Sequence, residues 1–144
     1  MAWYRIAIQP DEGSWLVTAP DFEEVATFGD TQEEECINGL AAIEEAIAGR
    51  IADSEDIPLP LRETPEKGHF VQLPAMTFLK SALYMILRSQ GKSRADLMRA
   101  LNWQRESVDR LFRLDHQSKL ESLEQAFMAL GVPLSFNVPF PVAA

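Results

Sequence analysis

The sequence contains very little cysteine and histidine. Cys36 is the single cysteine among 144 residues, and the two histidines are His69 and His116. One cysteine excludes an internal disulfide framework, and no group of cysteine and histidine has the spacing of a zinc site. We therefore expect no metal and no cofactor, and a reducing, cytoplasmic setting.

Long apolar runs are also missing. The first residues, MAWYRIAIQPDE, lack the basic region and apolar core of a signal peptide, and no apolar run approaches the roughly 18 residues of a membrane span. Yet 47% of the residues are hydrophobic, which is ordinary for a folded protein. These features predict a soluble globular protein of one domain or two small ones.

Basic residues are scarce in the first half of the chain only. Residues 1–66 carry 16 acidic and 3 basic side chains, net −13, whereas residues 67–144 carry 6 acidic and 10 basic side chains, net +4. The two sums give the net charge of −9. This asymmetry favours an acidic module for a basic partner and a basic module for a polyanion, although two solvated surfaces of unequal composition would give the same counts.

Alternating apolar residues predict a small sheet in the first half. Residues 3–8 and 14–19 alternate apolar and polar side chains around the turn sequence PDEG, which predicts a β-hairpin. A third short strand is expected at 24–28. After the proline-containing loop at 52–68, the sequence HFVQLP predicts a fourth strand that Pro74 ends.

A long helix is predicted between the third and fourth strands. Thr31 and Glu34 fit a capping box, and glutamates crowd the first turn, where the helix dipole favours negative charge. Apolar residues at helical spacing continue to Ile51, and Gly49 fits a stop near the end. The expected first module, residues 1–74, is strand, strand, strand, helix, strand.

Four helices are predicted in the second module, residues 75–144. Gly91 ends the first helix, and Ser93 with Asp96 starts the second. Asn102 ends the second helix because asparagine tolerates positive φ better than other non-glycine residues. The third helix lies within QRESVDRLFRL and buries Val108, Leu111 and Phe112.

The fourth helix has an apparent capping box of its own. Ser118 and Glu121 have the required three-residue spacing before an apolar stretch. The expected buried side chains of the first and fourth helices are Phe78, Leu79, Ala82, Leu83, Ile86, Leu87, Leu120, Leu123, Phe127 and Leu130.

The second and third of these helices predict a helix-turn-helix that binds DNA. In this motif the second helix enters the major groove, where arginine grips guanine or phosphate and glutamine grips adenine. A four-helix bundle with a solvated basic face is the alternative, and Glu106 can equally well pair with Arg110 along the helix. The candidate DNA-binding residues are Ser93, Arg94, Gln104, Arg105, Glu106, Asp109, Arg110 and Arg113.

The chain resembles the HicB family of toxin–antitoxin antitoxins, in the version that ends in a helix-turn-helix. YRIAIQPDEGSWLVTAPDFEEVATFGDTQEEECINGLAAIEEAI is similar to the family's hairpin, Pro-Asp turn and Gly-Asp-Thr helix start, and IPLP and FVQLP follow in order. SRADLMRALNWQRESVDRLFRLDHQSKLESLEQAFMALG resembles the DNA-binding region, including the Arg110-Leu111 pair and the segment with His116, Lys119 and Leu120. Met98 stands where a small residue is usual, and Asn102 where glycine is common.

The resemblance implies an α+β protein with a partial RNase H-like N-terminal domain, followed by an all-α helix-turn-helix domain. It further implies that the acidic domain binds a basic ribonuclease toxin of the HicA family by imitating phosphate charge, and that the second domain represses the operon. Trp15 and Phe22 are candidate anchors, although tryptophans more often serve as packing residues. The full set of candidate toxin-binding residues is Asp11, Glu12, Trp15, Asp21, Phe22, Glu23 and Glu24.

Catalysis is not expected, although RNase H-like folds suggest metal-dependent nucleases. Two-metal chemistry needs several converging carboxylates, whereas Asp11, Glu12, Asp21 and Asp30 all stand at turns or at a helix start. The alternative function is a stand-alone transcription regulator whose acidic domain senses another protein or a ligand.

A homodimer or a higher even oligomer on an inverted-repeat operator is expected, because one helix-turn-helix reads only a few base pairs. In the C-terminal tail Leu134, Phe136 and Val138 alternate with other residues, which favours a short strand that pairs with a second chain. Packing of the tail on its own helices is the alternative.

Overall fold

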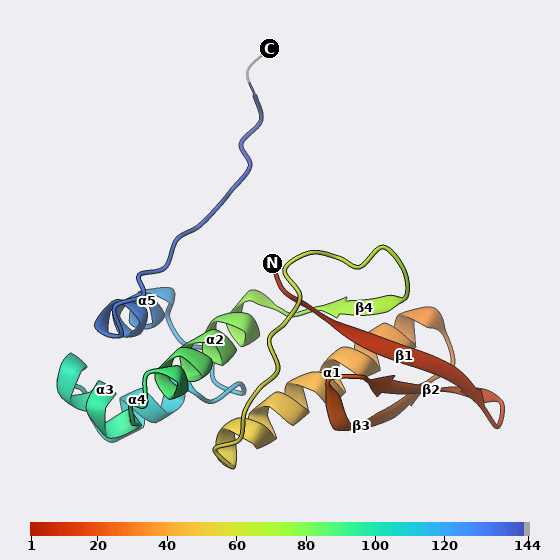
Figure 1. The fold of residues 1–144 in the computed structure, drawn as a ribbon, viewed down its shortest axis with the longest axis horizontal. Helices are drawn as coiled ribbons and strands as arrows, with labels where there is room; N and C mark the ends of the chain where they lie inside the picture. Colours follow the sequence, from red (N-terminus) through yellow and green to blue (C-terminus); the bar gives the residue numbers. More distant parts are fainter. Residues whose placement is uncertain (143–144) are drawn as a thin grey trace.

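A computed structural model describes residues 1–142, and its α+β architecture confirms the predicted fold class (Figure 1). A four-stranded sheet with one long helix is followed by four shorter helices and an extended C-terminal segment. The elements are β1 (Trp3–Asp11), β2 (Ser14–Ala19), β3 (Phe22–Gly29), α1 (Gln32–Ala52), β4 (His69–Gln72), α2 (Ala75–Ser89), α3 (Arg94–Leu101), α4 (Arg105–Leu111) and α5 (Leu120–Ala129).

The four strands are antiparallel in the order β3-β2-β1-β4, so the predicted fourth strand does return to the sheet. The hairpin between β1 and β2 has a two-residue turn in which Glu12 (φ 46°) and Gly13 (φ 85°) both have positive φ. Such turns match the twist of the flanking strands. The turn therefore fixes which side chains of β1 and β2 face α1.

Helix α1 packs on one face of the sheet and builds the first part of the core. Tyr4, Val17, Ile43 and Ile47 are fully buried between them. The helix approaches β3 very closely at Gly29, where an added Cβ would lie 2.7 Å from the main-chain nitrogen of Glu35. This contact tolerates no side chain.

The start of α1 is as predicted, but its end is not. The hydroxyl of Thr31 accepts from the N–H of Glu34, while the carboxylate of Glu34 accepts from the N–H of Asp30. Gly49 lies inside the helix, which continues to Ala52. The expected stop at Gly49 is wrong because glycine ends a helix only where it adopts a left-handed conformation, and Gly49 does not.

Helix α2 lies between two parts of the molecule: the sheet and α1 on one side, and α3, α4 and α5 on the other. It buries polar side chains toward each of these two parts. Thr77 donates to Glu44 of α1 at 2.6 Å, and the hydroxyl of Tyr84 donates to the carbonyl of Glu55 at 2.6 Å. The predicted apolar face is therefore wrong in part. Buried residues include Thr77, Lys80, Ser81 and Tyr84, whereas the half-exposed Phe78, Ala82 and Ile86 line a groove of about 510 Å³ with the N-terminus and residues 59–62.

Helices α3, α4 and α5 surround a second part of the same continuous core, in which Leu97, Val108 and Leu123 are buried. The expected capping box of α5 is wrong. Lys119 precedes the helix without a side-chain cap, and the Ser118 hydroxyl donates to the carbonyl of Arg110 at 3.4 Å. Leu120 is also exposed instead of buried.

The C-terminal segment leaves α5 after Gly131 and extends away from the helices (Figure 1). Leu134 is half-buried against the core, while Phe136, Val138, Phe140 and Val142 are exposed. The alternative that this tail packs on its own helices is thus wrong beyond Leu134.

Gly29→Ala is expected to lower the free energy of unfolding by about 1–3 kcal/mol, because the methyl group displaces the backbone of α1. Gly49→Ala is the matched control. A Cβ at Gly49 meets nothing within 4 Å, so alanine in this helical position should stabilise the protein by roughly 0.5–1 kcal/mol. Urea denaturation of both variants checks the pair, and equal effects of the two would contradict the close approach at Gly29.

Candidate nucleic-acid interface

A short turn joins α3 and α4. Asn102 ends α3 in the predicted left-handed conformation, with φ 56° and ψ 44°, and the N–H of Trp103 donates to the carbonyl of Met98 at 3.1 Å. At the other end, the Ser93 hydroxyl accepts from the N–H of Asp96, whose carboxylate accepts from the N–H of Ser93. The predicted turn and the predicted start of α3 are both confirmed.

A buried lysine of α2 holds the C-terminal end of α4. The ammonium of Lys80 donates to the carbonyl oxygens of Arg110, Arg113 and His116 at 2.8, 2.7 and 2.6 Å. Carbonyls at a helix C-terminus have no partners within the helix and carry the negative end of its dipole. Lys80 satisfies them and thereby ties α4, and the turn that follows it, to α2.

The Lys80 ammonium is charged at neutral pH in spite of its burial. Burial lowers the pKa of Lys80 to about 8, and nearby Asp115 acts in the opposite direction. A pKa of about 8 is still above neutral pH, and three carbonyl acceptors match the three donors of an ammonium group. The contact is therefore an ionic helix cap.

Polar side chains line a groove on one side of α4. Its volume is about 580 Å³, and it is lined by Gln104, which directly precedes α4, and by Ser107 and Arg110 of α4, at three-residue spacing. Gln117 and Lys119, in the segment before α5, form the opposite wall. The groove thus presents amide, hydroxyl, guanidinium and ammonium groups, which are donors that suit phosphates and base edges.

The other side of α4 faces the end of α1. Here an oxygen of Asp109 lies 3.0 Å from a guanidinium nitrogen of Arg94 and its second oxygen lies 3.7 Å from Arg105. The guanidinium of Arg94 also lies over the ring of Phe112, 4.8 Å from its centroid. Arg94 and Asp109 therefore connect α3 to α4 in this structure.

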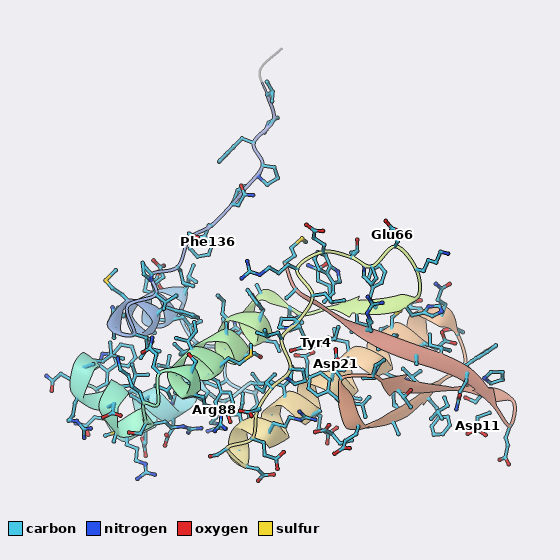
Figure 2. All side chains as sticks on the ribbon, viewed as in Figure 1. Tyr4, Asp11, Asp21, Glu66, Arg88 and Phe136 are labelled. Carbon is cyan, nitrogen blue, oxygen red and sulfur yellow. The ribbon has the colours of Figure 1, made fainter. Side chains whose placement is uncertain are left out.

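The acidic residues of the sheet lie at two separate ends. Asp11 and Glu12 are at the tip of the β1–β2 hairpin, whereas Asp21 and Glu23 are at the β2–β3 turn (Figure 2). Strand β2 separates the two turns with six residues, or roughly 20 Å. The seven predicted toxin-binding residues therefore do not form one patch.

Phe22 is fully buried, so its ring is not available as a surface anchor, contrary to expectation. It meets Tyr4 edge to face with ring centroids 4.9 Å apart, and the guanidinium of Arg50 lies over it at 5.0 Å. Arg50 also binds both oxygens of Glu24, at 2.8 and 2.7 Å, and this pairing lowers the pKa of Glu24. Phe22 and Glu24 thus have internal partners at this end of the sheet.

The hairpin end of the sheet combines exposed apolar side chains with carboxylates. Trp15 at the start of β2, Phe28 near the end of β3 and Ile37 in α1 are 42%, 49% and 57% exposed. Phe28 pairs with Leu16 and therefore lies on the face of the sheet opposite to Trp15, which pairs with Gly29. Asp11 and Glu12 are exposed at the turn next to Trp15. We call Asp11, Glu12 and Trp15 the hairpin-end surface, a combination suited to an aromatic anchor with an acidic rim.

Within residues 1–142, no three His, Cys, Asp or Glu side chains are grouped as ligands of a metal ion. No helix of that part of the chain is long and apolar enough to cross a membrane.

The sequence was compared with known protein families. Residues 3–82 match the family model described as HicB-like antitoxin of bacterial toxin–antitoxin systems. The chain belongs to the HicB-like antitoxin family. Its role is therefore that of an antitoxin in a toxin–antitoxin system, which is a regulatory role.

Relatives of this HicB-like chain extend over almost its whole length. Antitoxin HicB of Pseudomonas fluorescens (strain Pf0-1) is 34% identical over 94% of this chain and 92% of its own. Antitoxin HicB 2 of Photorhabdus laumondii is 32% identical over 89% and 90%, and antitoxin HicB of Escherichia coli (strain K12) is 29% identical over 92% and 96%. The likeness includes the helices after residue 82.

In this HicB-like antitoxin the predicted DNA-binding residues are divided between the two sides of α4. Gln104 and Arg110 line the polar groove, together with Ser107, Gln117 and Lys119, which sequence reasoning missed. The three-residue spacing of the α4 groove residues is a signal for one shared face. The other predicted residues lie on the other side of α4 or at the helix ends, and each takes part in a helix cap or an ion pair within this region: Ser93, Arg94, Arg105, Glu106, Asp109 and Arg113.

Lys80→Met is expected to lower the free energy of unfolding by roughly 2–5 kcal/mol, because it removes the ammonium donor that three carbonyls of the buried cap share. Lys92→Met is the matched control, since Lys92 is exposed. Thermal or urea unfolding followed by circular dichroism checks both. A Lys80→Met variant as stable as the Lys92→Met variant would show that the cap contributes nothing.

Proposed function

We propose that this antitoxin acts in the cytoplasm by binding a HicA-type ribonuclease toxin and by repressing its own operon through operator DNA. The observation that carries the proposal is the division of the surface. The sheet carries exposed carboxylates and an exposed tryptophan, whereas the groove beside α4 carries only donors and neutral side chains. A basic ribonuclease and a DNA duplex need these opposite chemistries.

For DNA, α4 enters the major groove with its polar groove facing the duplex. Gln104 and Arg110 are then the side chains that read base edges, and Ser107 and Lys119 contact phosphates. Arg110 is 3.8 Å from Glu106, and its side chain is half exposed. Such a long, solvated pair contributes little, so Arg110 is free to exchange it for DNA.

Arg110→Ala is expected to weaken operator binding by about 1–3 kcal/mol if the side chain contacts a base, or to reduce the salt slope by about one unit if it contacts phosphate. Arg88→Ala is the matched control, because Arg88 lies on α2 outside the polar groove, where it pairs at 3.0 Å with Asp56 of the segment after α1. Fluorescence anisotropy with operator DNA at several salt concentrations measures both. Unchanged binding after replacing Gln104, Arg110 and Lys119 together would refute this orientation of α4.

For the toxin, the hairpin-end surface is the stronger of the two acidic ends. Its carboxylates can occupy the cationic surface where a ribonuclease binds RNA phosphates, while Trp15 supplies the buried anchor that interfaces generally depend on. At the other end of the sheet, Glu24 is already neutralised by Arg50. Two of the predicted carboxylates at each end remain unpaired within the described residues, and the hairpin end adds an exposed tryptophan to its pair.

Trp15→Ala should weaken toxin binding by about 2 kcal/mol or more, as removal of an aromatic anchor does, and Asp11→Asn with Glu12→Gln should mainly slow association. Asp53→Asn is the control carboxylate, since it lies beside α1 at the other end of the sheet. Biolayer interferometry of the full-length chain against the purified toxin gives both rates. Loss of binding with Asp53→Asn but not with Trp15→Ala would move the interface to that end.

The operator is expected to be an inverted repeat, because two copies of α4 are needed for a site of useful length. Residues 1–74 and 75–144 remain the proposed toxin-binding and DNA-binding domains. The carboxylates and the groove lie on opposite sides of that boundary.

A further inference from the structure

The polar groove beside α4 has two walls that come from different parts of the chain. Ser107 and Arg110 of α4 line one wall, and residues 116–119, in the segment before α5, line the other. A groove that receives a duplex needs its walls at a fixed separation, because a site that is about 1 Å too loose loses affinity. The contacts that join the two walls therefore matter for DNA binding.

The ammonium of Lys80 joins the two walls. It donates to the carbonyl of Arg110 on the α4 wall at 2.8 Å and to the carbonyl of His116 on the opposite wall at 2.6 Å. Its third bond, at 2.7 Å, goes to the carbonyl of Arg113 in the turn between the walls. The hydroxyl of Ser118 also reaches the carbonyl of Arg110, but at 3.4 Å. The three shorter bonds of Lys80 are thus the main polar link between the walls.

Lys80 itself does not face the groove. Its side chain is fully buried, and the groove is lined by other residues. A bound duplex therefore does not touch this ammonium, and Lys80 can act on DNA only through the residues that it holds. Arg110 is the most direct of these, because Lys80 fixes its carbonyl while its side chain is the proposed base contact.

We propose that Lys80 is a positioning residue for operator DNA, and that its charged ammonium holds the two walls of the polar groove in the arrangement that binds a duplex. This role rests on the DNA-binding part of the proposed function. It goes beyond the helix cap, because it makes operator affinity depend on the charge of a residue that does not contact DNA. A charged ammonium has three donors for three carbonyls. A neutral amine has two N–H groups and a lone pair, so one carbonyl loses its donor.

The groups around Lys80 act on its charge in different directions. Burial lowers the pKa of Lys80 to about 8, Asp115 raises this pKa, and Arg113 lowers it. Lys80 is therefore charged at neutral pH and loses its charge within the range of a binding assay. The segment that Lys80 binds also contains Arg110, His116 and Lys119, while α5 adds the exposed Glu121 and Glu124, and α1 adds Glu44, which accepts from Thr77.

Operator affinity should fall as the pH rises through the pKa of Lys80, about 8. If DNA binds the arrangement that the charged ammonium holds, bound DNA favours the protonated form and raises this pKa, and proton loss weakens DNA binding by the same factor. The fold is not weakened by this proton loss. The pKa in the folded chain lies below its ordinary value of 10.5, so unfolding above pH 8 takes up a proton and becomes less favourable as the pH rises. A loss of affinity in this range is therefore not unfolding.

The first test measures operator binding of the full-length chain by fluorescence anisotropy at one ionic strength. From about pH 7 to about pH 9, the dissociation constant of the wild type should rise about fivefold, which corresponds to a pKa of Lys80 about one unit higher in the complex. Lys80→Arg keeps a charged donor at both pH values, so its dissociation constant should not change between them. Lys67→Met is the matched control, because Lys67 is exposed in the loop before β4, and it should keep the fivefold rise. Circular dichroism checks that each variant is folded.

A wild type that binds operator DNA equally well at the two pH values would overturn this role of Lys80. So would a Lys80→Arg variant with the same fivefold rise, because another group would then be responsible. A wild type that binds no operator DNA at either pH would instead refute the DNA-binding part of the proposed function, and the role of Lys80 with it.

The second test needs neither DNA nor a variant. In ¹³C-detected NMR spectra of the wild type, the carbonyl signals of Arg110, Arg113 and His116 should shift together as the pH rises, with a midpoint near 8. The carbonyl of Met98 is the control, because it accepts from the main-chain N–H of Trp103, which does not titrate. Signals of the three carbonyls that stay as constant as that of Met98 would overturn the proposal, even if the chain binds operator DNA.

Discussion

The ammonium of Lys80 is the contact on which the arrangement of the helical region depends. It collects three carbonyls from the end of α4 and the turn after it, and it does so from a helix that also hydrogen-bonds to α1 through Thr77. Burying a charged group costs free energy unless all of its hydrogen-bond donors have acceptors. Because all the donors of Lys80 have acceptors, this contact fixes α4 against α2, in addition to the apolar packing of Leu83 and Leu87 in the shared core.

Local ion pairs explain how an acidic chain can carry a helix that suits nucleic acid. On the side of α4 that faces the end of α1, Asp109 pairs with both Arg94 and Arg105 and so reduces the positive charge there. On the sheet, Arg50 neutralises Glu24. Among the described residues, the polar groove is lined by no carboxylate, whereas the hairpin end carries Asp11 and Glu12, so these two surfaces have opposite electrostatic character.

Features that depend on neighbouring residues could be predicted from the sequence, and features that depend on distant ones could not. The strands, the cap at Ser93 and the left-handed Asn102 follow from local patterns, and the structure has them. Ser118 has a perfect local capping pattern, yet its hydroxyl bonds to Arg110, which lies on another helix. Phe22 follows a turn and reads as exposed, but an irregular pairing between Thr18 and Ala19 turns it into the core. In the site itself, the contacts of Lys80 could not be predicted. Nothing in the sequence of α2 indicates that three carbonyls from the end of α4 and the turn after it lie beside this side chain.

The tail shows how the position of proline can decide between aggregation and specific assembly. An exposed strand with five apolar side chains would pair with any open edge if both of its own edges could donate. Three prolines on one edge remove its donors, so a neighbouring strand can pair along the other edge only. The odd-numbered spacing of Pro133, Pro139 and Pro141 therefore restricts strand pairing of the tail to its even-numbered edge.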